Sequence, residues 1–158
     1  MARIDLPPGE GLDVARALTL APQFAEVVAA YEKAVARTTL DRRLHELVRY
    51  RVAQLNACQV CLRFRWDSGV DENVHEQVAD WQSSSEFSQV ERAALSFTEQ
   101  FCRDSAAIPD ELIAELEELL SPALVVELTL VVGKYVAMGR FMQVLGLDQT
   151  CDLSPAHP

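Results

Sequence analysis

Apolar side chains recur at intervals of three and four residues along almost the whole chain, and this spacing constrains the fold more than any other feature. It places apolar side chains on one face of an α-helix, whereas a half-buried strand would need strict alternation of apolar and polar residues. The six glycines and seven prolines fall at the edges of the periodic segments. We therefore expect an all-α domain without a sheet.

About seven helices are expected, joined by short loops. Their approximate ranges are 22–35, 40–55, 58–67, 71–79, 88–102, 109–119 and 122–146. Thr38 or Thr39 is expected to cap the second helix, and Ser88 with Glu91 forms a capping box at the fifth. Gly69 is expected to end the third helix in the left-handed conformation. Short loops favour antiparallel neighbours, so the sequence predicts a helical bundle.

Length and charge limit the class of protein and its partners. The 158 residues suit one domain, 1–158, with irregular tails at 1–11 and 148–158. The 24 acidic and 14 basic side chains give a formal net charge of −10, which argues against binding of nucleic acid or anionic membranes. The N-terminal segment does not resemble a secretory signal, so we expect a cytoplasmic protein with a small-molecule or protein partner.

The last helix is long and apolar on more than one face. Such a helix must be covered on several sides, either by its own domain or by another subunit, so we expect a homo-oligomer. Glu127, Lys134 and Arg140 interrupt its apolar sequence, which argues against a membrane span. Glu127 and Lys134 share a face, and we expect them to pair across a subunit interface or to line a pocket.

The sequence Cys58-Gln59-Val60-Cys61 carries the clearest chemical signal. Two cysteines three residues apart at a helix start lie on one face and can form a disulfide. The helix N-terminus favours the reactive thiolate, most of all at the earlier cysteine. Alternatively, both are small buried side chains without a chemical role. Cys102 suits core packing and Cys151 lies in the tail; with the histidines scattered as well, we expect no metal or other cofactor.

Glu46 lies twelve residues before Cys58, on the helix that precedes the cysteine pair. If the chain reverses at Asn56, a crossing helix or a bridging water brings this carboxylate to the thiols, where a raised pKa would let it accept a proton. Alternatively, Glu46 is a hydrated surface residue flanked by His45 and Arg49. His45 points about 100° away from Glu46 on the same helix. Four aromatic residues are expected to wall a pocket or to pack in the core: Tyr50, Phe64, Trp66 and Trp81.

Glu46, followed after eleven residues by Cys58-x-x-Cys61, resembles the signature of the carboxymuconolactone decarboxylase and alkylhydroperoxidase D (AhpD-like) superfamily. The segment 127–146 is also similar to the last helix of that superfamily, and the similarity extends over about residues 40–147. The resemblance implies an all-helical AhpD-like bundle that assembles into dimers, trimers or hexamers built from dimers.

The resemblance also implies site roles. Cys61 would attack a peroxide, Cys58 would resolve the product to a disulfide, Glu46 would start a proton relay through a histidine, and a dithiol reductant protein would restore the thiols. This chain has Arg65 where the histidine belongs. Arginine stabilises a thiolate by its charge but does not shuttle protons, so either water or another histidine completes the relay. Alternatively, Arg65 forms a salt bridge with Asp67 or a neighbouring acid.

Three functions remain open from the sequence. The first is a CxxC thiol-dependent peroxidase or dithiol–disulfide oxidoreductase with an altered relay, acting on a small hydroperoxide or another small apolar substrate. The second is a carboxymuconolactone decarboxylase-like lyase or hydrolase, which would need an ionisable group in its pocket besides Glu46. The third is a non-enzymatic oligomeric module, which would seal the cysteine pair from solvent and leave no adjoining pocket.

Overall fold

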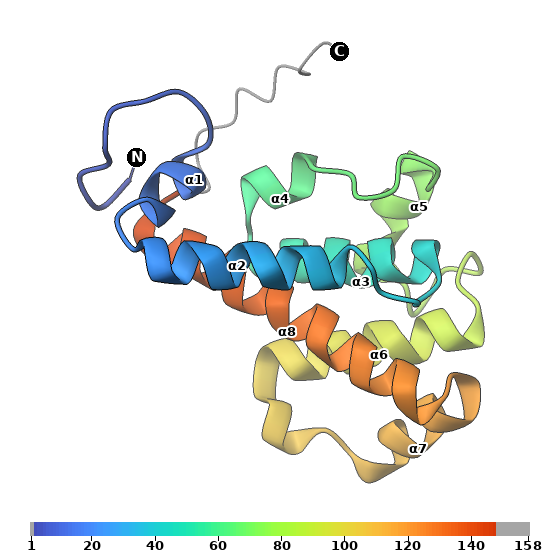
Figure 1. The fold of residues 1–158 in the computed structure, drawn as a ribbon. Coiled ribbons are helices and arrows are strands. Elements are labelled where there is room, and N and C mark those ends of the chain that lie inside the picture. The colour runs from blue at the N-terminus through green and yellow to red at the C-terminus, as the bar shows by residue number, and fades with distance from the viewer. Residues whose placement is uncertain (1, 148–158) are drawn as a thin grey trace.

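The computed structural model describes residues 2–147, and within that range the chain forms α-helices and 3-10 helices without strands (Figure 1). The α-helices are α1 (Asp13–Leu18), α2 (Pro22–Val35), α3 (Arg42–Leu55), α4 (Gln59–Arg63), α5 (Glu72–Gln77), α6 (Gln89–Asp104), α7 (Asp110–Leu119) and α8 (Pro122–Leu145), with 3-10 helices η1 (Val78–Asp80) and η2 (Ser105–Ala107). The all-α prediction is confirmed. The predicted tail at 148–158 lies outside the described residues.

Helix α3 lies at the centre, where it packs on α6 and α8 and carries α4 against its C-terminal half (Figure 1). The largest core cluster joins these helices to α2 and α7. Its fully buried members include Val48, Phe97, Leu116, Leu128 and Val132. The cluster forms because the apolar stripes of amphipathic helices exclude water only when they face one another.

Helix α4 is shorter than the sequence indicated, and α1 was not expected at all. We predicted that the third helix runs to residue 67, but α4 ends at Arg63 and Phe64 already has extended backbone. The buried carboxylate of Glu46 accepts a hydrogen bond from the Trp66 N–H at 3.1 Å, which holds this segment out of the helical path. The prediction that Gly69 closes the helix was wrong, since its φ is not positive.

Capping of the other helices agrees with the sequence in part. The capping box of Ser88 is present at the start of α6. Asp41, rather than either predicted threonine, caps α3. The hydroxyl groups of Thr38 and Thr39 instead donate to the carboxylate of Glu127 on α8, which ties the α2–α3 loop to the last helix.

Helix α8 is long and apolar, as predicted. By length and composition alone it is apolar enough to cross a membrane, a property that the core helices of globular domains share. Its contacts with α3, α6 and α7 make it part of the helical bundle. Val126, Leu130 and Val144 remain exposed on α8, and Phe24 and Val27 on α2. Coverage of these residues by a second subunit stays a prediction.

Candidate active site

The cysteine pair lies at the junction between α3 and α4. Asn56 ends α3, and Ala57 takes a positive φ of 50°, a conformation that non-glycine residues seldom adopt. Cys58 is then the N-cap of α4, and its sulfur accepts a hydrogen bond from the Cys61 N–H at 3.3 Å. The two sulfurs form a disulfide with an S–S distance of 2.07 Å and a Cα–Cα distance of 5.2 Å. The two cysteines are therefore paired at the start of α4, as their three-residue spacing predicts.

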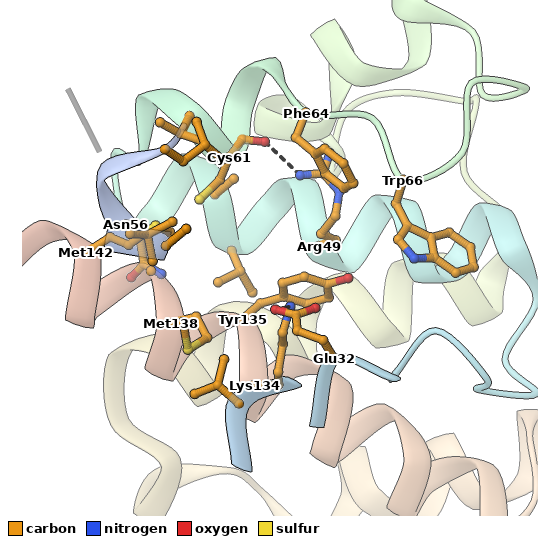
Figure 2. Close-up of a pocket in the computed structure, with 18 of the residues that line it drawn as sticks. Glu32, Arg49, Asn56, Cys61, Phe64, Trp66, Lys134, Tyr135, Met138 and Met142 are labelled. Carbon is orange, nitrogen blue, oxygen red and sulfur yellow. Dashed lines mark hydrogen bonds and ion pairs between the residues drawn. The ribbon is translucent and has the colours of Figure 1, made fainter. Parts of the chain in front are cut away.

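The two sulfurs differ in their access to a cavity. Cys58 is fully buried, whereas Cys61 is partly exposed and lines a cavity of about 370 Å³ (Figure 2). The lining is mainly apolar and includes Leu18, Val52, Phe64, Trp66, Met138 and Met142. The dipole argument favoured the earlier cysteine, but access favours Cys61 as the sulfur that meets a substrate. A sealed pair without a pocket, expected for a non-enzymatic module, is not what the structure shows.

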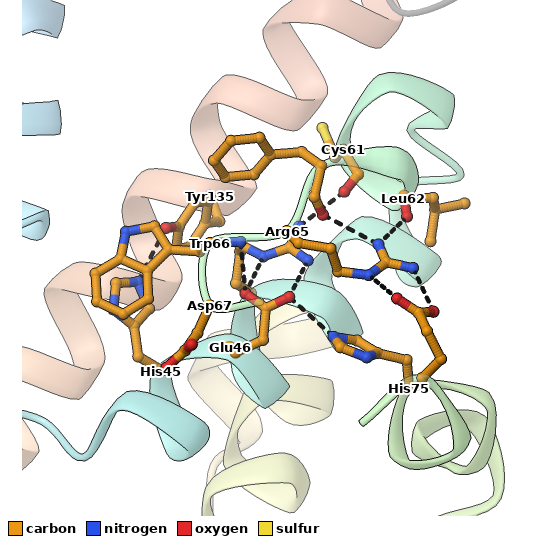
Figure 3. A network of polar contacts seen from close by, with 12 residues as sticks. His45, Glu46, Cys61, Leu62, Arg65, Trp66, Asp67, His75 and Tyr135 are labelled. Atoms are coloured by element: carbon orange, nitrogen blue, oxygen red, sulfur yellow. Dashed lines mark hydrogen bonds and ion pairs between the residues drawn. The ribbon is translucent and has the colours of Figure 1, made fainter. Parts of the chain in front are cut away.

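Glu46 is the centre of a fully buried polar network (Figure 3). Its carboxylate receives hydrogen bonds from Arg49 Nε at 2.8 Å and Arg49 Nη2 at 2.6 Å. The Trp66 N–H lies 3.1 Å from Oε2, and His75 Nε2 lies 2.9 Å from Oε1. A carboxylate only accepts hydrogen bonds, so His75 Nε2 carries a proton. The alternative that Glu46 is a hydrated surface residue is therefore wrong, because its carboxylate is buried and bound by protein groups.

The pKa of Glu46 is lowered, not raised as we expected. Burial alone would raise the pKa, but the hydrogen bonds and charge of Arg49, followed by those of His75, outweigh burial. Glu46 therefore remains a carboxylate and holds Arg49 in place. Arg49 in turn donates from Nη1 to the Cys61 carbonyl at 2.7 Å, and this hydrogen bond connects the network to the cysteine pair.

Arg65 forms the predicted salt bridge, and of the acids that the prediction allowed, its partner is the neighbouring Glu72. Its guanidinium binds both carboxylate oxygens of Glu72, at 2.7 and 2.9 Å. Asp67, the partner we named, binds Arg42 instead. The side chain of Glu72 is 65% exposed, so this pair lies at the surface.

Two arginines satisfy carbonyl groups near the end of α4. A short helix leaves its last carbonyls without helical partners, and cations near that end are favourable. Arg49 donates to the carbonyl of Cys61 (Figure 2), and Arg65 donates to the carbonyl of Leu62 at 2.5 Å (Figure 3). Two fixed positive charges thus bind consecutive carbonyl groups near the C-terminal end of the helix that carries the CxxC pair.

The two histidines near Glu46 have different surroundings. His75 comes from α5, 29 residues from Glu46, so neither spacing nor motif indicated their contact. Within the described residues, no hydrogen bond joins His75 to the cysteine pair. His45 points away from Glu46, as predicted, and its Nε2 lies 2.9 Å from the Tyr135 hydroxyl. Burial lowers the pKa of His45 to about 4, so this ring is neutral at pH 7.

A second polar pair lines the cavity. Lys134 on α8 is only 5% exposed, and its Nζ lies 2.5 Å from Glu32 Oε1 on α2 (Figure 2). Burial lowers the pKa of Lys134, and Glu32 opposes that shift. Lys134 therefore lines a pocket, as one of the two predictions has it, and pairing across a subunit interface stays a prediction. Nothing in the sequence indicated Glu32, because the two residues lie on separate helices.

The remaining sequence candidates differ in whether they reach the cavity. Cys102 is a half-buried free thiol whose pKa is raised by burial. Cys151 lies outside the described residues. Among the aromatic residues, Phe64 and Trp66 line the cavity, whereas Tyr50 and Trp81 pack on a separate core cluster. Between residues 2 and 147, no three His, Cys, Asp or Glu side chains come together as a metal site.

Comparisons with known proteins agree with this architecture. Residues 22–100 match the carboxymuconolactone decarboxylase family. The uncharacterized protein YdfG of Bacillus subtilis (strain 168) is 25% identical over 132 residues, which are 80% of this chain and 90% of that protein.

Solved structures extend the likeness over nearly the whole chain. A protein of unknown function from Agrobacterium tumefaciens, described as a putative antioxidant defence protein AhpD, has a TM-score of 0.80 at 20% identity, covering 96% of this chain and 100% of that one. A peroxidase-related protein from Silicibacter sp. TM1040 has a TM-score of 0.78 at 17% identity, covering 92% and 90%. At such identities the likeness concerns the fold. With residues 22–100 matched to its family, the chain belongs to the carboxymuconolactone decarboxylase family and has the AhpD-like all-α fold.

Proposed function

We propose that the protein is a thiol-dependent peroxidase of the AhpD type, in which Cys58 and Cys61 form the redox pair and small organic hydroperoxides are the substrates. The observation that carries this proposal is the asymmetry of the pair. Cys61 lines an apolar cavity, and Cys58 is buried within disulfide distance of it. A cavity of about 370 Å³ suits a small organic molecule.

The proposed reaction has two steps. The Cys61 thiolate attacks one peroxide oxygen, the O–O bond breaks, and the alkoxide leaves as an alcohol after taking a proton, so Cys61 becomes a sulfenic acid. The Cys58 thiol then attacks the Cys61 sulfur, water leaves, and the disulfide forms. The dithiol loses two electrons and the peroxide gains them. A dithiol reductant protein restores both thiols by disulfide exchange.

Arg49 supports this chemistry by its position. Its guanidinium is 2% exposed, lines the same cavity as Cys61 and binds the Cys61 carbonyl. A fixed positive charge near a thiol favours the thiolate, and Glu46 keeps Arg49 in place. In this proposal the proton of Cys61 leaves to water, because Arg65 is bound to Glu72 and is not a proton carrier.

The test is a thiol titration of the reduced protein before and after one equivalent of cumene hydroperoxide, in the Cys102→Ser, Cys151→Ser background. We expect two thiols to disappear. Adding Cys61→Ser should leave the remaining thiol unoxidised, whereas adding Cys58→Ser should give a sulfenic acid that dimedone traps. If both thiols survive the hydroperoxide, the proposal is wrong.

A second function is favoured by the Glu32–Lys134 pair. A lyase or hydrolase relative of carboxymuconolactone decarboxylase requires ionisable groups in its cavity. Glu46 is buried behind the cavity wall, whereas Glu32 and Lys134 line the cavity and are such groups. An enzyme of this kind would keep its activity on carboxylated lactones in the Cys58→Ser, Cys61→Ser variant. The peroxidase would lose all activity in the same variant.

We also propose that the protein is a homo-oligomer, a dimer, trimer or hexamer. The exposed apolar side chains on α2 and α8, among them Phe24, Val27 and Leu130, support association with another subunit. Light scattering coupled to gel filtration gives the subunit number. A Val27→Glu substitution should lower that number if this surface is the interface.

A further inference from the structure

The ammonium group of Lys134 is unusual among the charged groups of the cavity. Its side chain is 6% exposed, and its partner Glu32 is 50% exposed. Within the described part of the chain, Glu32 is its only ion-pair or hydrogen-bond partner, although an ammonium group has three N–H donors. The other buried cation of the cavity, Arg49, already binds the Glu46 carboxylate and the Cys61 carbonyl. Lys134 is therefore the cation with unused hydrogen-bonding capacity.

The position of Lys134 relative to Cys61 gives the cavity two chemically different ends. Figure 2 shows the Lys134–Glu32 pair and the Cys61 sulfur on opposite sides of the cavity. Most of the other side chains that line the cavity are apolar, among them Val52 and Met138. A molecule that filled this cavity would have an apolar body, one reactive group near Cys61 and a polar group at Lys134.

Glu32 shows which polar group fits at Lys134. Its carboxylate binds the ammonium at 2.5 Å, yet half of its side chain faces solvent, so it can return to water at little cost in solvation. A ligand carboxylate that took its place would form the same charge-assisted hydrogen bond. A neutral group would leave the Glu32–Lys134 pair intact and gain nothing from it. Glu32 therefore acts as an internal competitor of carboxylate ligands.

We propose that Lys134 is the binding site for the carboxylate of an amphipathic organic acid, whose apolar part fills the cavity beside Cys61 while Glu32 turns to solvent. This inference rests on the proposed function only in taking the cavity as the substrate site. It narrows the substrate class to hydroperoxides that carry a carboxylate. Binding itself needs no redox step and can be measured on the disulfide form.

The test compares two probes of nearly the same shape, 4-isopropylbenzoate and 4-isopropylbenzyl alcohol, by calorimetric titration of the oxidised protein at pH 6.5. We expect Lys134→Met to weaken binding of the acid at least tenfold and to change binding of the alcohol by less than twofold. Glu32→Gln should strengthen binding of the acid several-fold, because the competing carboxylate is removed. Binding of the alcohol should not change. Met138→Ala, a control in the same cavity wall, should change the binding of both probes by the same factor.

Other results would overturn the inference. If Lys134→Met weakens binding of the acid and of the alcohol equally, Lys134 only shapes the cavity. If Glu32→Gln weakens binding of the acid, Glu32 does not compete with it. Failure of the acid to bind the wild-type protein at millimolar concentration also contradicts the proposal. Because these titrations use the disulfide form, they fail or succeed independently of the thiol titration that tests peroxidase activity.

Discussion

Replacing Glu46 by glutamine tests whether the buried network holds the site together. The substitution keeps the side-chain shape but removes the charge that faces Arg49, whose guanidinium is 2% exposed. Breaking a buried ion pair by neutralising one partner costs about 3–5 kcal/mol, because the other charge stays buried without compensation. That is a large part of the about 5–15 kcal/mol by which domains are stable. The matched control is Glu72→Gln, which breaks a surface pair and should cost about 0–1 kcal/mol.

Urea unfolding at pH 7, with the disulfide intact, measures both variants. With an m-value of about 2 kcal/mol per molar, Glu46→Gln should lower the midpoint by about 1.5–2.5 M, and Glu72→Gln by less than about 0.5 M. The double variant Glu46→Leu, Arg49→Met removes both charges and should be more stable than Glu46→Gln. The lowered pKa of Glu46 means that its stabilisation is present above the pKa of the unfolded chain and is lost as the pH falls through the folded value. Equal midpoints for Glu46→Gln and Glu72→Gln would refute this account.

Three further predictions concern the same region. Gly139→Ala should destabilise the protein by about 1–3 kcal/mol, because the new Cβ would lie 2.3 Å from Asn56 Nδ2. Gly133→Ala, whose new Cβ has its nearest contact at 3.6 Å, should stabilise α8 by about 0.5–1 kcal/mol. Urea unfolding midpoints measure both effects. Because the pKa of His45 is lowered to about 4, the free energy of unfolding should fall by up to about 3 kcal/mol as the pH drops from the unfolded pKa of about 6.5 towards 4. In the His45→Leu variant, the free energy of unfolding should change less over that pH range. Arg65→His, which restores the family's histidine, should speed thiol oxidation by cumene hydroperoxide about tenfold or more, whereas Arg65→Gln should not.

The parts of the fold that local sequence determines were predictable. The three-and-four spacing of apolar residues sets each helix by itself, so the α-helices other than α1, and the apolar character of α8, follow directly. The proximity of Cys58 and Cys61 is also local, because residues three apart at a helix start are neighbours. The contact of Glu46 with Arg49 has the same i, i+3 spacing and could have been predicted as an ion pair rather than as a hydrated surface.

The contacts that define the site are not local, and for that reason the sequence did not indicate them. His75 and Glu32 reach the site from α5 and α2, and no spacing relates them to the residues they bind. The predicted length of α4 was wrong for the same reason. Its C-terminal residues continue the helical pattern, but Glu46 on another helix binds the Trp66 N–H and draws the chain away. Helix periodicity describes what a segment does alone, and a buried carboxylate from outside overrides it.

The difference between a charge and a proton carrier follows from the same geometry. The family's histidine would accept and release a proton one turn beyond Cys61, but here Arg65 is bound by Glu72 and Arg49 is bound by Glu46. Arginine keeps its proton at any working pH, so these residues contribute only fixed charge. A fixed charge lowers the free energy of the thiolate before the reaction begins, whereas a histidine also delivers a proton to the leaving alkoxide. In the proposed peroxidase reaction, the site is therefore suited to forming the Cys61 thiolate, and the proton for the departing oxygen comes from water.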